Sequence, residues 1–238
     1  MAGRQLLHPS AILRGLATAA LLFGGPGQAF AENTIQWVEV ALVLDEAGRA
    51  DVRYQVRWRA TAPMHGFHFQ GETARPRFEN GTAELPDGRQ VPLSITPVES
   101  DRWDIVLAGS EAWGPGEATY TFSYQADLAA AGLVALTQRA EGEKLTVFNW
   151  SPVEWDQPLQ HHTLTVQLSS VPAPHAGDLT LEEASTTGLR TEPWVNERYL
   201  ISYRGVSDPP ALWLRFHHEN VPAQGRHRVQ LYLPAAFS

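Results

Sequence analysis

The stretch WVEVALVLDEAGRADVRYQVRW, residues 37–58, alternates apolar and polar side chains on both sides of a short polar segment. The apolar side chains of each half share one face of an extended chain; they are Val38, Val40, Leu42 and Leu44, then Val52, Tyr54, Val56 and Trp58. The side chains that point away in the second half are Arg53, Gln55 and Arg57. Gly48 stands between the halves, where a turn is needed. The pattern predicts a β-hairpin with one buried face.

The same period of two continues along most of the remaining chain, in segments such as WDIVLAG (103–109) and ATYTFSYQADL (118–128). Seventeen prolines and nineteen glycines separate these segments at the spacing typical of antiparallel sandwiches. We therefore expect an all-β protein made of two antiparallel, immunoglobulin-like β-sandwich domains in tandem.

One stretch, LAAAGLVALTQRAEG (128–142), favours a short helix or an irregular crossover, because it is rich in Ala and Leu and contains no β-branched run. We place the domain boundary there. The expected organisation is a signal peptide at 1–31, a first sandwich at 32–128, a crossover at 129–143 and a second sandwich at 144–238.

The N-terminal segment has the features of an export signal. Arg4 and Arg14 precede the short apolar run GLATAALLFGG, and Ala29-Phe30-Ala31 supplies small residues at a cleavage site. The run is too short to cross a bilayer core of roughly 30 Å, although an uncleaved anchor is the alternative. We expect cleavage after Ala31 and a periplasmic or secreted mature chain without a membrane span.

The amino-acid composition excludes several classes of function. The chain contains no cysteine, which excludes disulfides, thiolate metal sites and cysteine nucleophiles. Without Arg4 and Arg14 it carries 16 basic against 26 acidic side chains. Such an acidic balance argues against a nucleic-acid partner and against a polybasic membrane contact.

Several stretches together are similar to a known family; they are MHGFHFQG (64–71), DGRQVPLSITPVESDRWDIVLAG (87–109), GPGEATYTFSYQADL (114–128) and LTVFNWSPVEWDQPLQHHTLTVQLS (145–169). Over about residues 34–170 the chain resembles the extracytoplasmic N-terminal part of the domain of unknown function 2207 family. The positions that carry the pattern are Phe148, Asn149, Trp150, Trp155 and Pro158. The resemblance implies a β-rich exported domain and no known activity. Family members are expected to continue into membrane helices, whereas this chain stops at LYLPAAFS (231–238), which implies a free-standing version or one that docks on a separate membrane partner.

The stretch VFNWSPVEWD (147–156) is the first candidate site. Glu154 and Asp156 would lie about 6.6 Å apart on one side of an extended segment, but an acid and a nucleophile must flank the scissile bond of a glycan from opposite sides. We expect Trp150 and Trp155 to be buried, with the polar residues tying down a turn. The alternative is an exposed aromatic platform for a sugar ring or a partner, with both acids beside it.

Loop tryptophans are the second candidate. Trp113 in SEAWGPGE and Trp194 in TEPWVNE sit in turn-like contexts, where an exposed indole can carry binding energy at an interface. Packing beneath the loops is the alternative for each.

Metal and cofactor chemistry has little support. His161 and His162 are adjacent, as are His217 and His218, so the members of each pair point to opposite faces of a strand. The chain has neither the G-x-S-x-G signature of a serine hydrolase nor a phosphate-binding glycine loop. We expect no metal, no cofactor and no catalysis. The predicted function is a non-catalytic binding or assembly module of the cell envelope, with an envelope protein or cell-wall glycan as partner; the alternative is a glycan-binding or glycan-active protein that uses 147–156.

Overall fold

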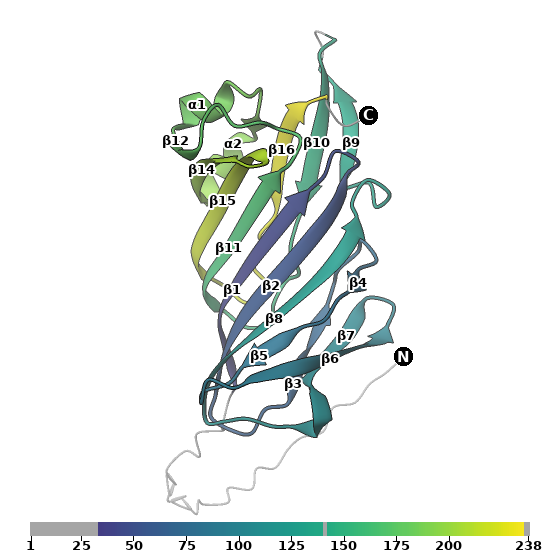
Figure 1. Ribbon diagram of the computed structural model, residues 1–238, viewed down its shortest axis with the longest axis vertical. Helices are drawn as coiled ribbons and strands as arrows, with labels where there is room; N and C mark the ends of the chain where they lie inside the picture. The colour runs from purple at the N-terminus through teal and green to yellow at the C-terminus, as the bar shows by residue number, and fades with distance from the viewer. Residues whose placement is uncertain (1–32, 140–141, 236–238) are drawn as a thin grey trace, which may run out of the picture. The chain divides into compact units, whose positions relative to one another are not determined.

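The computed structural model describes residues 33–139 and 142–235, and the expected signal peptide at 1–31 lies outside the described residues. Strands dominate the described part, which confirms the all-β class (Figure 1). The strands of the larger sheet are β1 (Thr34–Leu44), β2 (Arg49–Ala60), β3 (Gly66–Gln70), β4 (Arg77–Phe78), β5 (Thr82–Glu84), β6 (Gln90–Glu99), β7 (Arg102–Leu107), β8 (Gly116–Asp127), β11 (Leu159–Leu168), β12 (Gly177–Leu179), β14 (Leu200–Ser207) and β15 (Pro210–Val221). The strands of the smaller sheet are β9 (Val134–Gln138), β10 (Lys144–Trp150), β13 (Arg190–Thr191) and β16 (Val229–Pro234).

The larger sheet runs in the order β12-β14-β15-β11-β1-β2-β8-β5-β6-β7-β3, with β4 paired to β8. Strands β1 and β2 form the predicted hairpin, with Leu44 opposite Ala50 at its closed end. Gly48 takes φ +76° in the turn and donates its N–H to the carbonyl of Asp45 at 3.1 Å. Only glycine adopts this conformation without strain, so the turn fixes the register of the pair.

The alternation in 37–58 divides the larger sheet into a buried and an exposed side. All eight apolar side chains predicted for the inner face are buried. Arg53 and Ala41, which lie on the opposite side, are exposed. We call that opposite side of strands β14, β15, β11, β1, β2 and β8 the outer face.

The two halves of the chain are joined within one sheet. Strand β1 pairs in parallel with β11, from Trp37 opposite His161 to Leu44 opposite Leu168. Residues 31–238 form one compact unit. The structure therefore does not confirm two tandem sandwiches separated at 129–143. A parallel pair between strands more than a hundred residues apart leaves no local signal in the sequence, because period two predicts a strand and not its neighbour.

The segment expected to be a short helix or an irregular crossover begins with turns and continues as a strand. Residues 128–133 form turns in which the N–H groups of Leu128 and Ala129 donate to the carbonyl of Gly48. Strand β9 then begins at Val134 and pairs antiparallel with β10. Of the two alternatives for 128–142, the short helix does not form in the described residues, because pairing with β10 outweighs the weak helix propensity of an Ala-rich stretch.

The two sheets share one hydrophobic core, which contains residues of both halves. At its centre Tyr54 stacks on Phe122 at 5.3 Å between ring centroids and meets Phe69 edge-on at 5.1 Å. Trp155 reaches the same cluster from the C-terminal half, 6.4 Å from Phe69. Buried aromatic pairs of this kind add to the apolar area that each ring removes from water.

The helical segments are short: η1 (Ala108–Ser110), α1 (Leu181–Ser185) and α2 (Pro193–Arg198). Helix α1 begins with a capping box, in which the Thr180 side chain accepts from the N–H of Glu183 and the Glu183 carboxylate accepts from the N–H of Thr180. Helix α2 begins with Pro193, whose missing N–H costs nothing at that position. Within 33–139 and 142–235 there is no helix of the length and hydrophobicity that crossing a bilayer requires.

Candidate functional site

VFNWSPVEWD comprises the end of strand β10 and an extended segment beneath the larger sheet. Trp150 is 2% exposed and Trp155 is 7% exposed. The Trp155 ring lies 5.8 Å from that of Phe67, and the N–H of Val153 donates to the hydroxyl of Tyr54 at 3.3 Å. Both indoles are therefore core residues, as expected. The alternative of an aromatic platform at these two rings is wrong, because neither has an open face for a sugar.

The two acids of this stretch are exposed and act separately. Glu154 accepts from Nε of Arg226 at 2.8 Å and borders a groove of about 450 Å³. Asn149 and Arg228 line the same groove, and Asp156 does not. The two carboxylates are not paired across one hollow, so this geometry does not favour acid–base work on a glycan.

The two loop tryptophans behave differently from each other. Trp113 is 5% exposed and donates its indole N–H to the hydroxyl of Tyr120 at 2.8 Å. Trp194, at the start of α2, is only partly buried, and the guanidinium groups of Arg198 and Arg228 lie 5.8 and 5.9 Å from its ring centroid. Trp113 is thus a packing residue, whereas Trp194 keeps part of its surface and two cation–π neighbours.

The histidine pairs do point to opposite faces, and strand pairing brings them together across the sheet. On the inner face, His162 lies directly opposite His218. His227 packs between them and Tyr199, with ring centroids 4.3 Å from His162 and 4.6 Å from Tyr199. His162 and His227 are each 1% exposed. Sequence reasoning missed this cluster, because the register between β11 and β15 is not visible in either pair alone.

These inner histidines are neutral in the folded protein. Burial, with a smaller contribution from the neighbouring imidazoles, lowers the pKa of His162 to about 3 and that of His227 to about 2. The backbone of Phe216 opposes the shift of His227 in part. Within the described residues, neither ring nitrogen of His227 has a hydrogen-bond partner in good geometry, nor does Nε2 of His162. A proton added to either ring would place an unpaired charge in the core, so protonation of this cluster destabilises the folded state.

The outer partners of the same pairs lie among aromatic and acidic side chains. His161 stacks on Trp37 at 5.7 Å between ring centroids and lies 5.3 Å from His217. Nε2 of His161 is 3.4 Å from a carboxylate oxygen of Glu39, and Nδ1 of His217 is 2.8 Å from the hydroxyl of Thr163. Nowhere in the described ranges do three or more His, Asp or Glu side chains converge as a metal ion would require.

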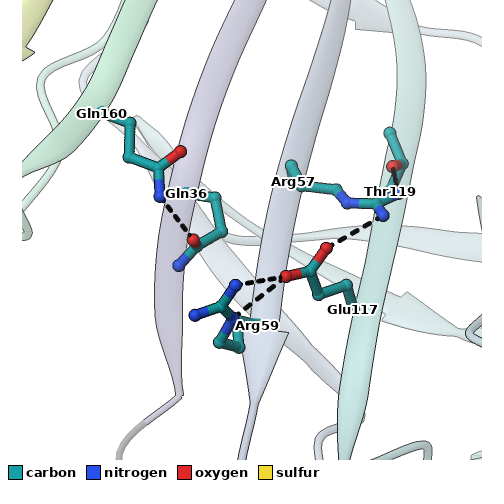
Figure 2. A network of polar contacts seen from close by, with 6 residues as sticks. All are labelled: Gln36, Arg57, Arg59, Glu117, Thr119 and Gln160. Carbon is teal, nitrogen blue, oxygen red and sulfur yellow. Dashed lines mark hydrogen bonds and ion pairs between the residues drawn. The ribbon is translucent and has the colours of Figure 1, made fainter.

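A polar network beside Trp37 and His161 joins the strands of the outer face (Figure 2), since Arg57 lies opposite Trp37. The Glu117 carboxylate accepts from Nη2 of Arg59 at 2.6 Å and from Nη2 of Arg57 at 3.1 Å. The two guanidinium groups, that of Arg59 first, hold the pKa of Glu117 below its usual value. Beside this network, Nε2 of Gln160 donates to the side-chain oxygen of Gln36 at 2.7 Å, across the parallel pair. One carboxylate is shared by two guanidinium groups, so the network keeps a net positive charge, but both arginines already hold ion pairs and hydrogen bonds to Glu117.

Other arginines of the outer face have no ion-pair partner in the described structure. Arg53, Arg204 and Arg215 are exposed, and in the described part of the chain none of them has an ion-pair or hydrogen-bond partner. Cross-strand pairing places Arg215 opposite Thr165, which is aligned with Ala41, and Ala41 is opposite Arg53. Two free guanidinium groups thus flank a floor of short side chains in the middle of the sheet.

A buried carboxyl group supports the loop between β3 and β4. Glu72 is 4% exposed, accepts from the hydroxyl of Tyr124 at 2.5 Å and accepts from the N–H of Ala74 at 3.0 Å. Burial raises the pKa of Glu72, and these hydrogen bonds offset part of that rise. The carboxyl group ties the loop to the inner face of β8.

We expect Glu72→Ala to lower the free energy of unfolding by about 2–3 kcal/mol, because it leaves the Tyr124 hydroxyl and the Ala74 N–H buried without an acceptor. Glu72→Gln keeps an acceptor for Ala74 and should cost less. Urea unfolding of the three proteins measures the difference. Equal stability of Glu72→Ala and the parent protein would show that water replaces the carboxyl group.

No protein-family model matches the chain, and no curated protein matches it. Among solved structures, the chain is similar to the crystal structure of a mutant M1 zinc metallopeptidase from Deinococcus radiodurans bound to a Tyr-Ser-Ala substrate, with 11% identity and a TM-score of 0.49. The similarity covers 84% of this chain and 42% of that chain, so this chain spans less than half the length of the peptidase. A likeness of this size assigns neither an activity nor a ligand.

Proposed function

We propose that this protein is an exported, non-catalytic binding or assembly module of the cell envelope and that the outer face is its binding surface. Export is supported by the leader pattern that ends at Ala29-Phe30-Ala31. The resemblance to the extracytoplasmic part of the domain of unknown function 2207 family supports the same placement. In this role the core aromatic residues hold the sheet in shape, and the side chains of the opposite side make the contacts.

The observation that carries the proposal is the free charge on the outer face of an otherwise acidic protein. The whole chain has a formal charge of −8, yet Arg53, Arg204 and Arg215 stand on one side of the sheet without partners in the described structure. Unpaired arginine is enriched where proteins bind, because its planar fork makes paired hydrogen bonds to anionic groups.

Affinity purification from the native envelope fraction tests this role. A C-terminally tagged protein is cross-linked, and the recovered proteins and glycans are identified. The outer-face variant Arg53→Glu/Arg215→Glu is compared with Glu154→Lys, which changes the groove lined in part by VFNWSPVEWD. We expect the parent protein and Glu154→Lys to recover the same partner and the outer-face variant to lose it.

The opposite pattern contradicts the proposal. If the partner is retained by the outer-face variant and lost by Glu154→Lys, the binding surface is the groove lined by Asn149, Glu154 and Arg228. Both variants replace exposed side chains, so their thermal unfolding midpoints should match that of the parent protein and exclude a general loss of fold.

A further inference from the structure

We propose that the outer face binds a linear polysaccharide that carries carboxylate groups, laid across strands β15, β11, β1 and β2. This inference rests on the proposed function, because it names the partner of the same surface. Three features of the outer face carry it: the free arginines, the short side chains between them, and two partly exposed indoles.

The free arginines set the sign of the ligand charge. Arg215 and Arg53 belong to one row of cross-strand neighbours, with Thr165 and Ala41 between them. Strands β15 and β2 are three positions apart in the sheet, so the two Cα atoms are separated by about 14 Å. A polymer with anionic groups repeated along its length can satisfy both guanidinium groups at once, whereas a single small anion cannot.

Short side chains leave room for a flat ligand between the arginines. Ala41 is exposed in the centre of the sheet, and Thr165, its neighbour on β11, is partly exposed. Thr163, one row further on, is buried beneath His217 and its other neighbours. The floor is therefore low at Ala41 and Thr165, and longer side chains stand around it.

The indoles favour a sugar over a peptide as the repeating unit. Trp213 lies opposite Gln167 of β11, and Trp37 is aligned with His161 of the same strand. Six residues of β11 separate these two rows, which corresponds to about 20 Å along the strand. Both rings are partly exposed. Trp213 lies in the row next to that of Arg215, so its indole can stack on the C–H side of a sugar unit whose carboxylate reaches this arginine. Trp37 lies further along the strands, and one face of its ring is stacked on His161.

The acidic side chains of the outer face do not neutralise Arg53 and Arg215 at its centre. Glu39 lies 3.4 Å from His161 and Glu219 lies 3.7 Å from His217, and Glu117 is paired with Arg57 and Arg59. Asp178 lies opposite Arg204, toward the edge of the sheet. Asp51 is exposed and lies opposite Val43, in the row beside Arg53. The positive pair of Arg53 and Arg215 thus remains between these acids.

Binding to immobilised alginate, a linear polyuronate, tests the inference, with the neutral glucan pullulan and with poly-L-glutamate as comparisons. The variants are Arg53→Ala/Arg215→Ala and Trp213→Ala. The matched control, Lys144→Ala/Arg226→Ala, removes the same charge from exposed positions off the outer face. We expect the parent protein and the control to bind alginate alike. Arg53→Ala/Arg215→Ala should bind alginate at least about tenfold more weakly. Trp213→Ala should weaken alginate binding as well, and pullulan should bind poorly.

Three results would overturn the inference: no binding of alginate, binding of poly-L-glutamate as tight as that of alginate, or an equal loss in the control. The envelope recovery experiment separates this failure from that of the proposed function. If Arg53→Glu/Arg215→Glu loses its envelope partner but alginate does not bind the parent protein, only the assignment of the ligand as a polysaccharide is wrong. If Arg53→Glu/Arg215→Glu keeps its envelope partner, the proposed function itself is wrong.

Discussion

Lowering the pH from about 7.5 to about 4.5 should destabilise the protein by about 5 kcal/mol through His162 and His227 alone. In the unfolded chain each imidazole binds a proton below about pH 6.5. In the folded protein burial holds their pKa values at about 3 and about 2. The unfolded state therefore takes up more protons across this window. The stability contribution is complete above about pH 6.5 and is lost progressively as the pH falls toward about 3.

The double variant His162→Leu/His227→Leu isolates this effect. It removes both proton-binding groups, and it replaces ring nitrogens that have no partner in the described structure, so stability near neutral pH should change little. Urea unfolding at several pH values should give a much flatter acid limb for the double variant than for the parent protein. His65→Leu, which removes an exposed imidazole, is the matched control and should keep the parent slope. An unchanged slope in the double variant would contradict the neutral, buried state of the cluster.

Trp155→Ala should lower the free energy of unfolding by about 3–5 kcal/mol, because it removes a large buried ring and leaves a cavity next to Phe67 and Phe69. Denaturant unfolding followed by far-UV circular dichroism measures the change. A loss of this size is a large part of the stability of a typical domain.

Glu154→Ala is the control for this prediction, because it changes the neighbouring residue, whose side chain is exposed and paired with Arg226. An exposed ion pair contributes little, so this variant should cost under about 0.5 kcal/mol. A denaturant midpoint of Trp155→Ala equal to that of the parent protein would place the indole at the surface and restore the sugar-platform interpretation of VFNWSPVEWD.

Local pattern predicts the strands of this protein well, and their arrangement poorly. Alternation in 37–58 identified both strands of the hairpin, the buried set and the exposed Arg53, because side-chain direction in a strand depends only on parity. The parallel pairing of β1 with β11 depends on contacts between distant segments, which no local period encodes. For the same reason the Ala-rich segment before Val134 was assigned to a crossover between domains, although strand β9 pairs there with β10.

The candidate site residues show the same contrast between what local pattern predicts and what only the sheet arrangement determines. Burial of Trp150 and Trp155 was expected because large indoles at a strand and its turn remove much apolar area from water, and the structure confirms it. The two histidine clusters required the register between β11 and β15, in which His162 meets His218. The sequence contains every residue of the outer face, but only the sheet order brings Arg53 and Arg215 into one row.

Hydroxyl-radical footprinting of the protein in its native envelope fraction addresses the binding surface most directly, since it reports on individual tryptophans. Trp37, Trp213 and Trp194 are all partly exposed, and only the first two lie on the outer face. We expect oxidation of Trp213 and Trp37 to fall when the envelope fraction is present and oxidation of Trp194 to stay the same. Protection of Trp194 with no change at Trp37 and Trp213 would contradict the assignment of the outer face as the binding surface.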